Sequence, residues 1–125
     1  MDKIKVLVVD DESRMRKLVH DFLSRSNYEV IEAADGEEAI DIFYADKSIS
    51  LIILDVMMPK LDGMTATRLI RAMDRADARV IPIIAMTANA FEEDARKCIA
   101  AGMNVHMAKP LDLDEVIEVI ARLCS

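Results

Sequence analysis

The chain has few cysteines and no long apolar run. Its 125 residues include only Cys98 and Cys124, which are too far apart in the sequence to form a disulfide framework or a pattern of metal-binding thiolates. No stretch approaches the roughly 20 apolar residues of a membrane-spanning helix. Residues 1–3 lack the basic, apolar and small-residue regions of a secretory signal. We therefore expect a soluble, cytoplasmic chain without a membrane span, with both thiols packed as small hydrophobic groups.

A basic patch is also missing. The formal net charge is −7, whereas a protein held by nucleic-acid phosphates needs clustered Lys and Arg to release counterions. We therefore expect no direct nucleic-acid partner. Acidity by itself mainly favours solubility, so the informative question is whether the negative charges converge.

The composition is that of a globular protein, with 53% hydrophobic and 31% charged residues. A chain of this length buries about two thirds of the surface that its unfolded form exposes, and it leaves no room for a second core. We expect one domain over residues 1–125.

Apolar runs suited to buried strands alternate with segments of helical period. The first helical segment places Met15, Leu18, Val19, Phe22 and Leu23 on one face, which is the i, i+3, i+4, i+7, i+8 spacing of an amphipathic helix. Gly102 is predicted to follow the end of a helix and Asp112 to begin the last one. Strands are predicted at residues 4–9, 28–33, 50–55, 80–86 and 103–108. Helices are predicted to include residues 15–23, 39–43, 66–73, 90–101 and 113–120.

Strands that alternate with helices predict a parallel, doubly wound α/β sheet covered on both faces, because parallel strands need right-handed crossovers. The pattern alone does not determine the strand order. In either common order, binding sites lie at the carboxyl ends of the strands, near the point where the winding reverses.

Polar residues follow four of the predicted strands. Asp10 and Asp11 come after the first, Asp55 ends the third, Thr87 follows the fourth and Lys109 follows the fifth. In a parallel sheet these ends lie on one edge, so the side chains should converge. Each has an ordinary explanation alone, such as an acidic helix start or a solvated lysine, but all of them together are hard to attribute to solvation.

The charges predict the chemistry of this edge. Two carboxylates about 4 Å apart repel by roughly 4 kcal/mol at an effective dielectric near 20, so three of them need a cation or a raised pKa. Mg²⁺ accepts one or two carboxylates and keeps positions for water and phosphate oxygens. Lys109 supplies a point charge for an anion and Thr87 a hydroxyl donor. A carboxylate nucleophile with these partners predicts Mg²⁺-dependent phosphoryl transfer to an aspartate.

Five motifs in order give the sequence a clear family resemblance. From about Lys3 to Leu123 the chain resembles the receiver domains of response regulators and hybrid sensor kinases in two-component signalling. The first half is most similar to receivers of transcription regulators and the second half to receivers of hybrid kinases. The motifs are Asp10–Asp11, Asp55 with Met58–Pro59, Asp62–Gly63, Met86–Thr87–Ala88 and Lys109–Pro110.

The resemblance implies a flavodoxin-like fold with strand order 2-1-3-4-5. It implies that Asp55 accepts a phosphoryl group from the phosphohistidine of a sensor kinase or phosphotransfer protein. Asp11, Asp55 and the backbone carbonyl of Met57 would bind Mg²⁺, with Asp10 acting through water. Lys109, before a cis peptide bond to Pro110, would pair with the phosphoryl group.

The resemblance also implies a switch rather than a turnover enzyme. Thr87 would move to hydrogen-bond the phosphoryl group and change a surface made by the fourth helix, the fifth strand and the fifth helix, where an effector binds. His106 stands where family members usually have Tyr or Phe, and it would act with Thr87 as a smaller switch residue that can titrate.

Three other functions would each have their own sequence requirements. A phosphatase with an aspartyl-phosphate intermediate would need a second Asp at position 57, where this chain has Met. A flavin or nucleotide module would need a glycine-rich or hydroxyl-rich phosphate loop after the first strand. A degenerate receiver that serves as a phosphorylation-independent docking module is the strongest alternative, although every phosphoacceptor residue is present.

Overall fold

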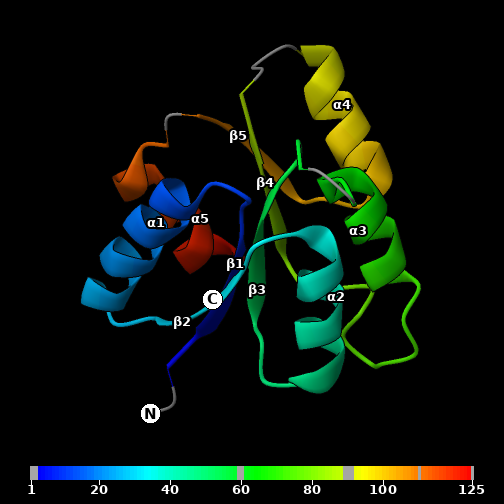
Figure 1. Cartoon of the computed structure of the whole chain (residues 1–125), viewed down its shortest axis with the longest axis horizontal. Helices are drawn as coiled ribbons and strands as arrows, with labels where there is room; N and C mark the ends of the chain where they lie inside the picture. Colours follow the sequence, from blue (N-terminus) through cyan, green and yellow to red (C-terminus); the bar gives the residue numbers. More distant parts are fainter. Residues whose placement is uncertain (1–2, 59–60, 89–91, 110, 125) are drawn as a thin grey trace.

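The computed structural model describes residues 3–58, 61–88, 92–109 and 111–124, and it forms a three-layer α/β fold (Figure 1). Strands and helices alternate along the described chain, as the sequence predicts. Across these residues, no helix is both long and apolar enough to cross a membrane. The elements are β1 (Lys5–Val9), α1 (Ser13–Arg25), β2 (Glu29–Ala33), α2 (Gly36–Ala45), β3 (Leu51–Asp55), α3 (Gly63–Arg71), β4 (Ile83–Thr87), α4 (Glu92–Ala101), β5 (Val105–Ala108) and α5 (Leu113–Leu123).

The sheet is parallel, with strand order β2-β1-β3-β4-β5, which confirms the flavodoxin-like topology. β1 pairs with both β2 and β3, so the winding reverses beside it. The register of the central pair matches Val9 with Leu54, and this pairing brings the carboxyl ends of β1 and β3 side by side.

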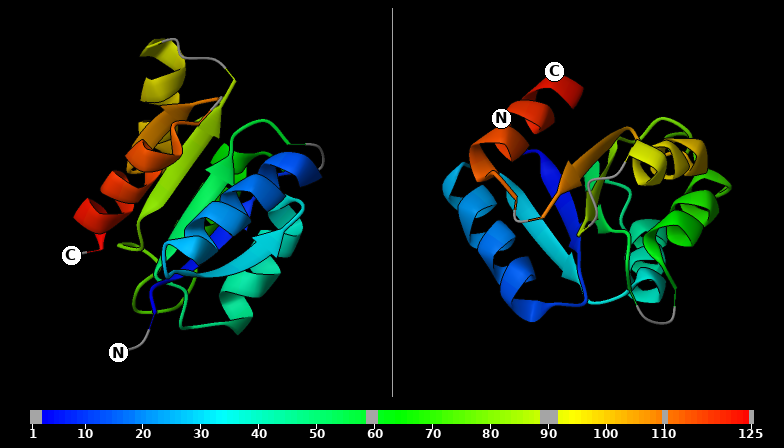
Figure 2. Two further views of the ribbon diagram at one scale, coloured as in Figure 1. Left: turned by 90° about the vertical axis from the view of Figure 1, so that its left-hand side faces the viewer. Right: turned by 90° about the horizontal axis from the view of Figure 1, so that it is seen from above.

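Helices cover both faces of the sheet (Figure 2). One core contains Leu7, Ile52 and Ile83 from the sheet and lies under α2, α3 and α4. The other contains Val8, Ile53 and Met86 and lies under α1 and α5. Alternate residues of each strand therefore enter opposite cores, which is why the central strands are apolar runs rather than an alternating pattern.

Aspartates cap three of the helices. The side chains of Asp35, Asp62 and Asp112 accept hydrogen bonds from backbone amides of the first turns of α2, α3 and α5. Gly102 follows the carboxyl end of α4, as predicted for the residue after a helix. Its φ of +112° lies in the left-handed region that glycine favours.

Several predictions on single residues were wrong. β4 begins at Ile83, because residues 74–81 form turns held by backbone bonds to Asp77, and Val80 is 73% exposed. Leu18 and Leu69 lie on exposed sides of their helices. Val119 of α5 is buried in the core under α1 and α5.

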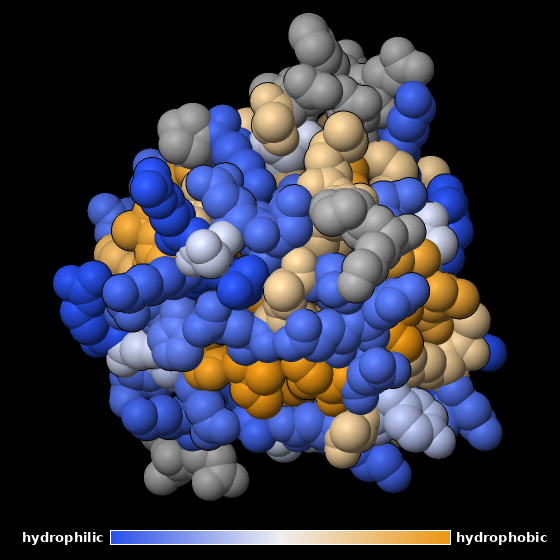
Figure 3. All heavy atoms as spheres, in the orientation of Figure 1, coloured by the Kyte–Doolittle hydropathy of each residue, from blue (hydrophilic) through white to orange (hydrophobic). Residues whose placement is uncertain are grey.

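Hydrophilic residues cover most of the face shown in Figure 3, as expected for an acidic, highly charged chain. Of the two thiols, Cys98 is fully buried in the core under α4, as predicted, and Cys124 is half-buried just after α5.

Candidate functional site

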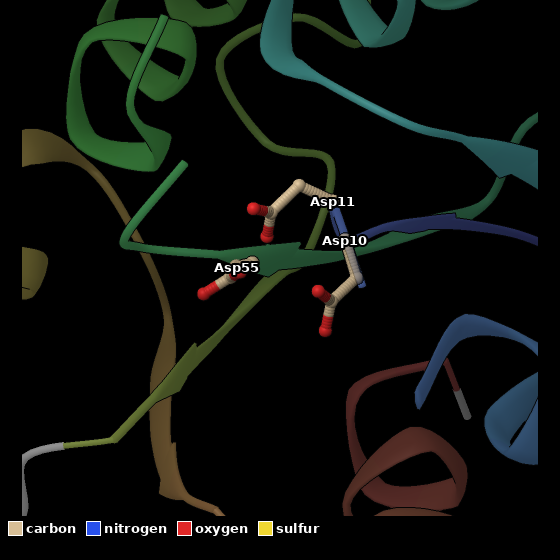
Figure 4. A group of neighbouring side chains, drawn as sticks. All are labelled: Asp10, Asp11 and Asp55. Atoms are coloured by element: carbon tan, nitrogen blue, oxygen red, sulfur yellow. The ribbon is translucent and has the colours of Figure 1, made fainter. Parts of the chain in front are cut away.

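Three aspartates meet at the carboxyl edge of the sheet. Asp10 and Asp11 follow β1, and Asp55 is the last residue of the neighbouring strand β3 (Figure 4). One carboxylate oxygen from each of Asp10, Asp11 and Asp55 lies within 4.8 Å of the others. The sequence-based expectation that strand ends bring these residues together is therefore confirmed.

Asp55 is almost out of contact with water, with 3% of its surface exposed. Its Oδ1 accepts a hydrogen bond from the backbone amide of Met57 at 3.2 Å. Burial, reinforced by the negative charge of Asp10, raises the pKa of Asp55 to about 7 against the opposing effects of Lys109 and the Met57 amide. The carboxyl group therefore changes its charge near neutral pH.

Asp10 is fully buried beside it. Its Oδ1 accepts the backbone amide of Glu12 at 2.9 Å, which closes the turn between β1 and α1. Its Oδ2 faces Nζ of Lys109 at 3.1 Å, and no hydrogen bond to this oxygen occurs among the described residues. Charge attraction rather than a directed bond stabilises that oxygen.

Lys109 lies across the site from the aspartates. Its Nζ is 3.1 Å from Asp10 and 3.4 Å from Oδ2 of Asp55. Its backbone amide donates to the carbonyl of Thr87 at 2.7 Å, so the ends of β4 and β5 are joined at this point. Burial acts to lower the pKa of Lys109, but its contact with Asp10 and the charges of Asp55 and Asp10 outweigh that effect and raise the pKa.

Thr87 and Met57 complete the surroundings of Asp55. Thr87 is the last residue of β4 rather than the residue after it, and it is buried. Met57 is 69% exposed, whereas the next residue, Met58, is buried. Met57 lies two residues beyond Asp55 in the sequence.

Gly63 sets how closely α3 approaches Asp55. Its backbone amide donates to the carbonyl of Val56 at 3.1 Å. A Cβ at Gly63 would lie 2.3 Å from the carbonyl oxygen of Asp55, far inside van der Waals contact. Only glycine lets the helix start this near to the end of β3.

The donor set suits a hard divalent cation. Three carboxylates lie together, and the ammonium of Lys109 pairs with two of them, Asp10 and Asp55. Burial, together with the negative charge of Asp10, raises the pKa of Asp55. Mg²⁺ prefers oxygen ligands and commonly takes one or two carboxylates with waters. Asp10, Asp11 and Asp55 are therefore groups able to hold such an ion.

His106 lies on β5 opposite Ala85, which belongs to the core under α2, α3 and α4. The side chain is partly exposed, but its Nε2 is buried and has no hydrogen-bond partner within the part of the chain that the structure describes. The predicted cis bond between Lys109 and Pro110 lies outside the described residues.

Sequence reasoning missed a polar contact between α1 and β2. Nδ1 of His20 on α1 is 2.7 Å from Oε2 of Glu32 on β2. The other oxygen of Glu32 accepts from Nε of Arg16 at 3.0 Å. A glutamate inside a predicted, largely apolar strand was the one signal for this arrangement.

A protein-family comparison matches residues 6–121 to the response regulator receiver domain. The chain is 34% identical over 126 residues to hybrid signal transduction histidine kinase I of Dictyostelium discoideum, covering 97% of this chain and 7% of the kinase. It is 38% identical over 116 residues to the transcriptional regulatory protein ResD of Bacillus subtilis, covering 93% of this chain and 46% of ResD. The chain thus spans less than half of either relative.

Solved structures agree with the sequence comparison. The receiver domain of the sensor histidine kinase PA1611 from Pseudomonas aeruginosa has a TM-score of 0.89 and 34% identity, with 98% of each chain covered, and carries a magnesium ion in its active-site cleft. The chemotaxis protein CheY4 of Vibrio cholerae has a TM-score of 0.90 and 29% identity, with 98% of this chain and 99% of CheY4 covered. The chain therefore belongs to the family of response regulator receiver domains.

Proposed function

We propose that this receiver domain accepts a phosphoryl group on Asp55 from a phosphohistidine, in a reaction that depends on Mg²⁺. The observation that carries the proposal is the arrangement of Asp55, which lies within reach of two further carboxylates and 3.4 Å from the ammonium of Lys109. A buried carboxylate among a cation-binding cluster and a fixed lysine matches the needs of phosphoryl transfer.

In the proposed reaction an oxygen of ionised Asp55 attacks the phosphorus atom. The P–N bond to the donor imidazole breaks, its electron pair returns to the ring nitrogen, and a P–O bond to Asp55 forms. Mg²⁺, when bound, would neutralise the phosphoryl oxygens and orient them for attack. Asp11, Asp55 and the Met57 carbonyl would bind the ion directly, and Asp10 would act through water.

Lys109 has two parts in this proposal. Before transfer it partly offsets the negative charges of Asp10 and Asp55, with which it is paired. After transfer the ammonium is positioned to pair with an oxygen of the new phosphoryl group, because the phosphorus is attached to the Asp55 carboxylate that Lys109 already faces. It contributes no covalent step.

Thr87 and His106 form the proposed output. Thr87 ends β4 beside the site, and its hydroxyl would hydrogen-bond the phosphoryl group. His106 on β5 would respond through the space between the sheet and α4, so that the surface of α4, β5 and α5 changes for an effector. The buried, unpartnered Nε2 of His106 supports a residue that gains from moving.

The proposed partners follow from the family. Receiver domains act with histidine kinases and effectors as signalling modules, and relatives of both the hybrid-kinase and the transcription-regulator type are found. We propose a phosphohistidine on a kinase or phosphotransfer protein as donor, and no turnover of other substrates.

Purified chain incubated with phosphoramidate, with and without Mg²⁺, tests the proposal. We expect a base-labile phosphoryl adduct on Asp55 that forms only with Mg²⁺. Unlabelled protein in both samples would favour a phosphorylation-independent docking module, and steady release of phosphate from unrelated monoesters would favour a phosphatase.

A further inference from the structure

Arg16 on α1 connects the aspartate cluster to the edge strand of the sheet. Its Nη1 donates to the backbone carbonyl of Asp10 at 2.7 Å, and its Nε donates to Oε1 of Glu32 at 3.0 Å. The Arg16 side chain is largely buried, with 19% exposed. The guanidinium therefore joins the residue that precedes Asp11 to strand β2.

Glu32 is itself held from a second side. Its Oε2 lies 2.7 Å from Nδ1 of His20, one turn along α1 from Arg16. With both carboxylate oxygens engaged, Glu32 has little freedom to turn away from the guanidinium. The result is a chain of contacts from His20 through Glu32 and Arg16 to the backbone at Asp10.

The backbone contact matters because the peptide bond is planar. The carbonyl of Asp10 and the amide of Asp11 share one rigid plane, so fixing the carbonyl oxygen also fixes the direction in which the chain enters Asp11. The amide of Asp10 is bound independently to the carbonyl of Ala33 at 3.2 Å. Arg16 thus fixes the carbonyl group of Asp10, from which the chain continues to Asp11.

We propose that Arg16, oriented by Glu32, is a positioning residue that holds Asp10 and Asp11 in the geometry needed to bind Mg²⁺. This inference rests on the proposed function of the aspartate cluster. Groups that orient metal ligands typically change metal affinity by about 10–100-fold when they are removed.

The sign of the effect separates positioning from simple electrostatics. Removing the positive charge of Arg16 should, by Coulomb attraction alone, strengthen the binding of a cation nearby. Loss of positioning should weaken it. A fall in Mg²⁺ affinity after the loss of a positive charge therefore cannot come from the charge itself.

Lys5 on β1 offers a matched control. Its side chain is also 19% exposed and also pairs with a glutamate of β2, Glu29, at 3.3 Å, with Asp46 as a second partner at 3.0 Å. This cluster lies at the amino end of the same strand, away from the aspartates that end β1. Lys5→Met removes one charge and one ion-pair cluster without touching Asp10 or Asp11.

The experiment measures the Mg²⁺ dissociation constant of the whole chain by titration calorimetry, together with the urea midpoint without metal. We expect Arg16→Met to weaken Mg²⁺ binding at least about tenfold. Glu32→Gln should weaken it in the same direction, because the guanidinium loses its charged partner. Lys5→Met should lower stability and leave the Mg²⁺ dissociation constant within about twofold of wild type, as expected for a distant site.

A second readout follows the backbone directly. In metal-free protein, the ¹⁵N order parameter of the Asp11 amide should fall in Arg16→Met and stay unchanged in Lys5→Met. Unchanged or tighter Mg²⁺ binding by Arg16→Met would overturn the inference. So would an equal loss in Lys5→Met, because general destabilisation would then be sufficient. Wild type that binds no Mg²⁺ would instead overturn the proposed function itself.

Discussion

The ammonium nitrogen of Lys109 lies 3.4 Å from Oδ2 of Asp55, and the two residues come from the ends of strands that are not adjacent in the sheet. β4 separates their strands, so the lysine must reach across the end of β4 to meet the carboxylate. This contact puts a positive charge beside the proposed nucleophile.

Lys109→Ala should keep Mg²⁺ binding, because the carboxylates remain, but it should weaken the conformational response to phosphorylation. The reason is that the ammonium is the charge expected to pair with the phosphoryl group. NMR shifts of β5 on addition of Mg²⁺ with BeF₃⁻ measure this response. Full wild-type shifts in Lys109→Ala would contradict the assigned role.

Asp55 should make the metal-free protein less stable as the pH rises. Its pKa is about 7 in the folded chain against an ordinary value of 3.8, so between these values the folded state binds a proton that the unfolded state has released. The stabilisation is complete below about pH 4 and is lost as the pH rises through about 7.

Asp55→Asn removes this titration. Urea unfolding at several pH values should find the variant more stable than wild type at pH 8, on the order of 2 kcal/mol, with the difference vanishing near pH 4. Parallel stability curves for the two proteins would show that burial of the ionised carboxylate costs nothing.

Gly63→Ala should destabilise the fold and also slow phosphorylation. The added methyl would meet the Asp55 carbonyl at 2.3 Å, and crowding of this kind typically costs about 1–3 kcal/mol. Gly36→Ala is the matched control, since its methyl would meet a different carbonyl, that of Leu61, at 2.5 Å.

Urea unfolding and the rate of labelling by phosphoramidate compare the two glycine variants. Both should lose stability, but only Gly63→Ala should lose a large part of the labelling rate, because only its clash displaces the nucleophile. Equal labelling rates would mean that the approach of α3 to Asp55 does not position the carboxylate.

Thr87→Ala should still accept the phosphoryl group on Asp55. Its conformational response to phosphorylation should be weaker than that of wild type. Thr87 is buried at the end of β4, and its carbonyl receives the amide of Lys109. Thr67→Ala, which removes another buried threonine hydroxyl, is the control. Reduced BeF₃⁻-induced shifts in Thr87→Ala alone would support the switch role, whereas similar shifts in both variants would contradict it.

The sequence predicted which side chains lie at the carboxyl edge of the sheet, because the alternation of strands and helices along the chain was sufficient. Once β1, β3, β4 and β5 were recognised as parallel, Asp10, Asp55, Thr87 and Lys109 had to lie at one edge, whatever the detailed packing. The fold class and the strand order that the family resemblance implied are confirmed in the same way.

Features that depend on register and docking could not be predicted. The contact of His20 with Glu32 needs α1 to settle on the side of the sheet where β2 presents that glutamate. Val80 was predicted to belong to the fourth strand. In the structure it lies in the turns around Asp77, before β4 begins at Ile83. Met57 follows a buried strand in the sequence. The chain leaves the sheet directly after Asp55, however, and Met57 is exposed.

The central claim is that Asp55 is the phosphoacceptor, and intact-protein mass spectrometry after phosphoramidate treatment with Mg²⁺ tests it most directly. Wild type should gain one phosphoryl group, which metal chelation prevents and mild base removes. Asp55→Asn should gain none while unfolding cooperatively. Labelling of Asp55→Asn at the wild-type rate, or of wild type without Mg²⁺, would contradict the account.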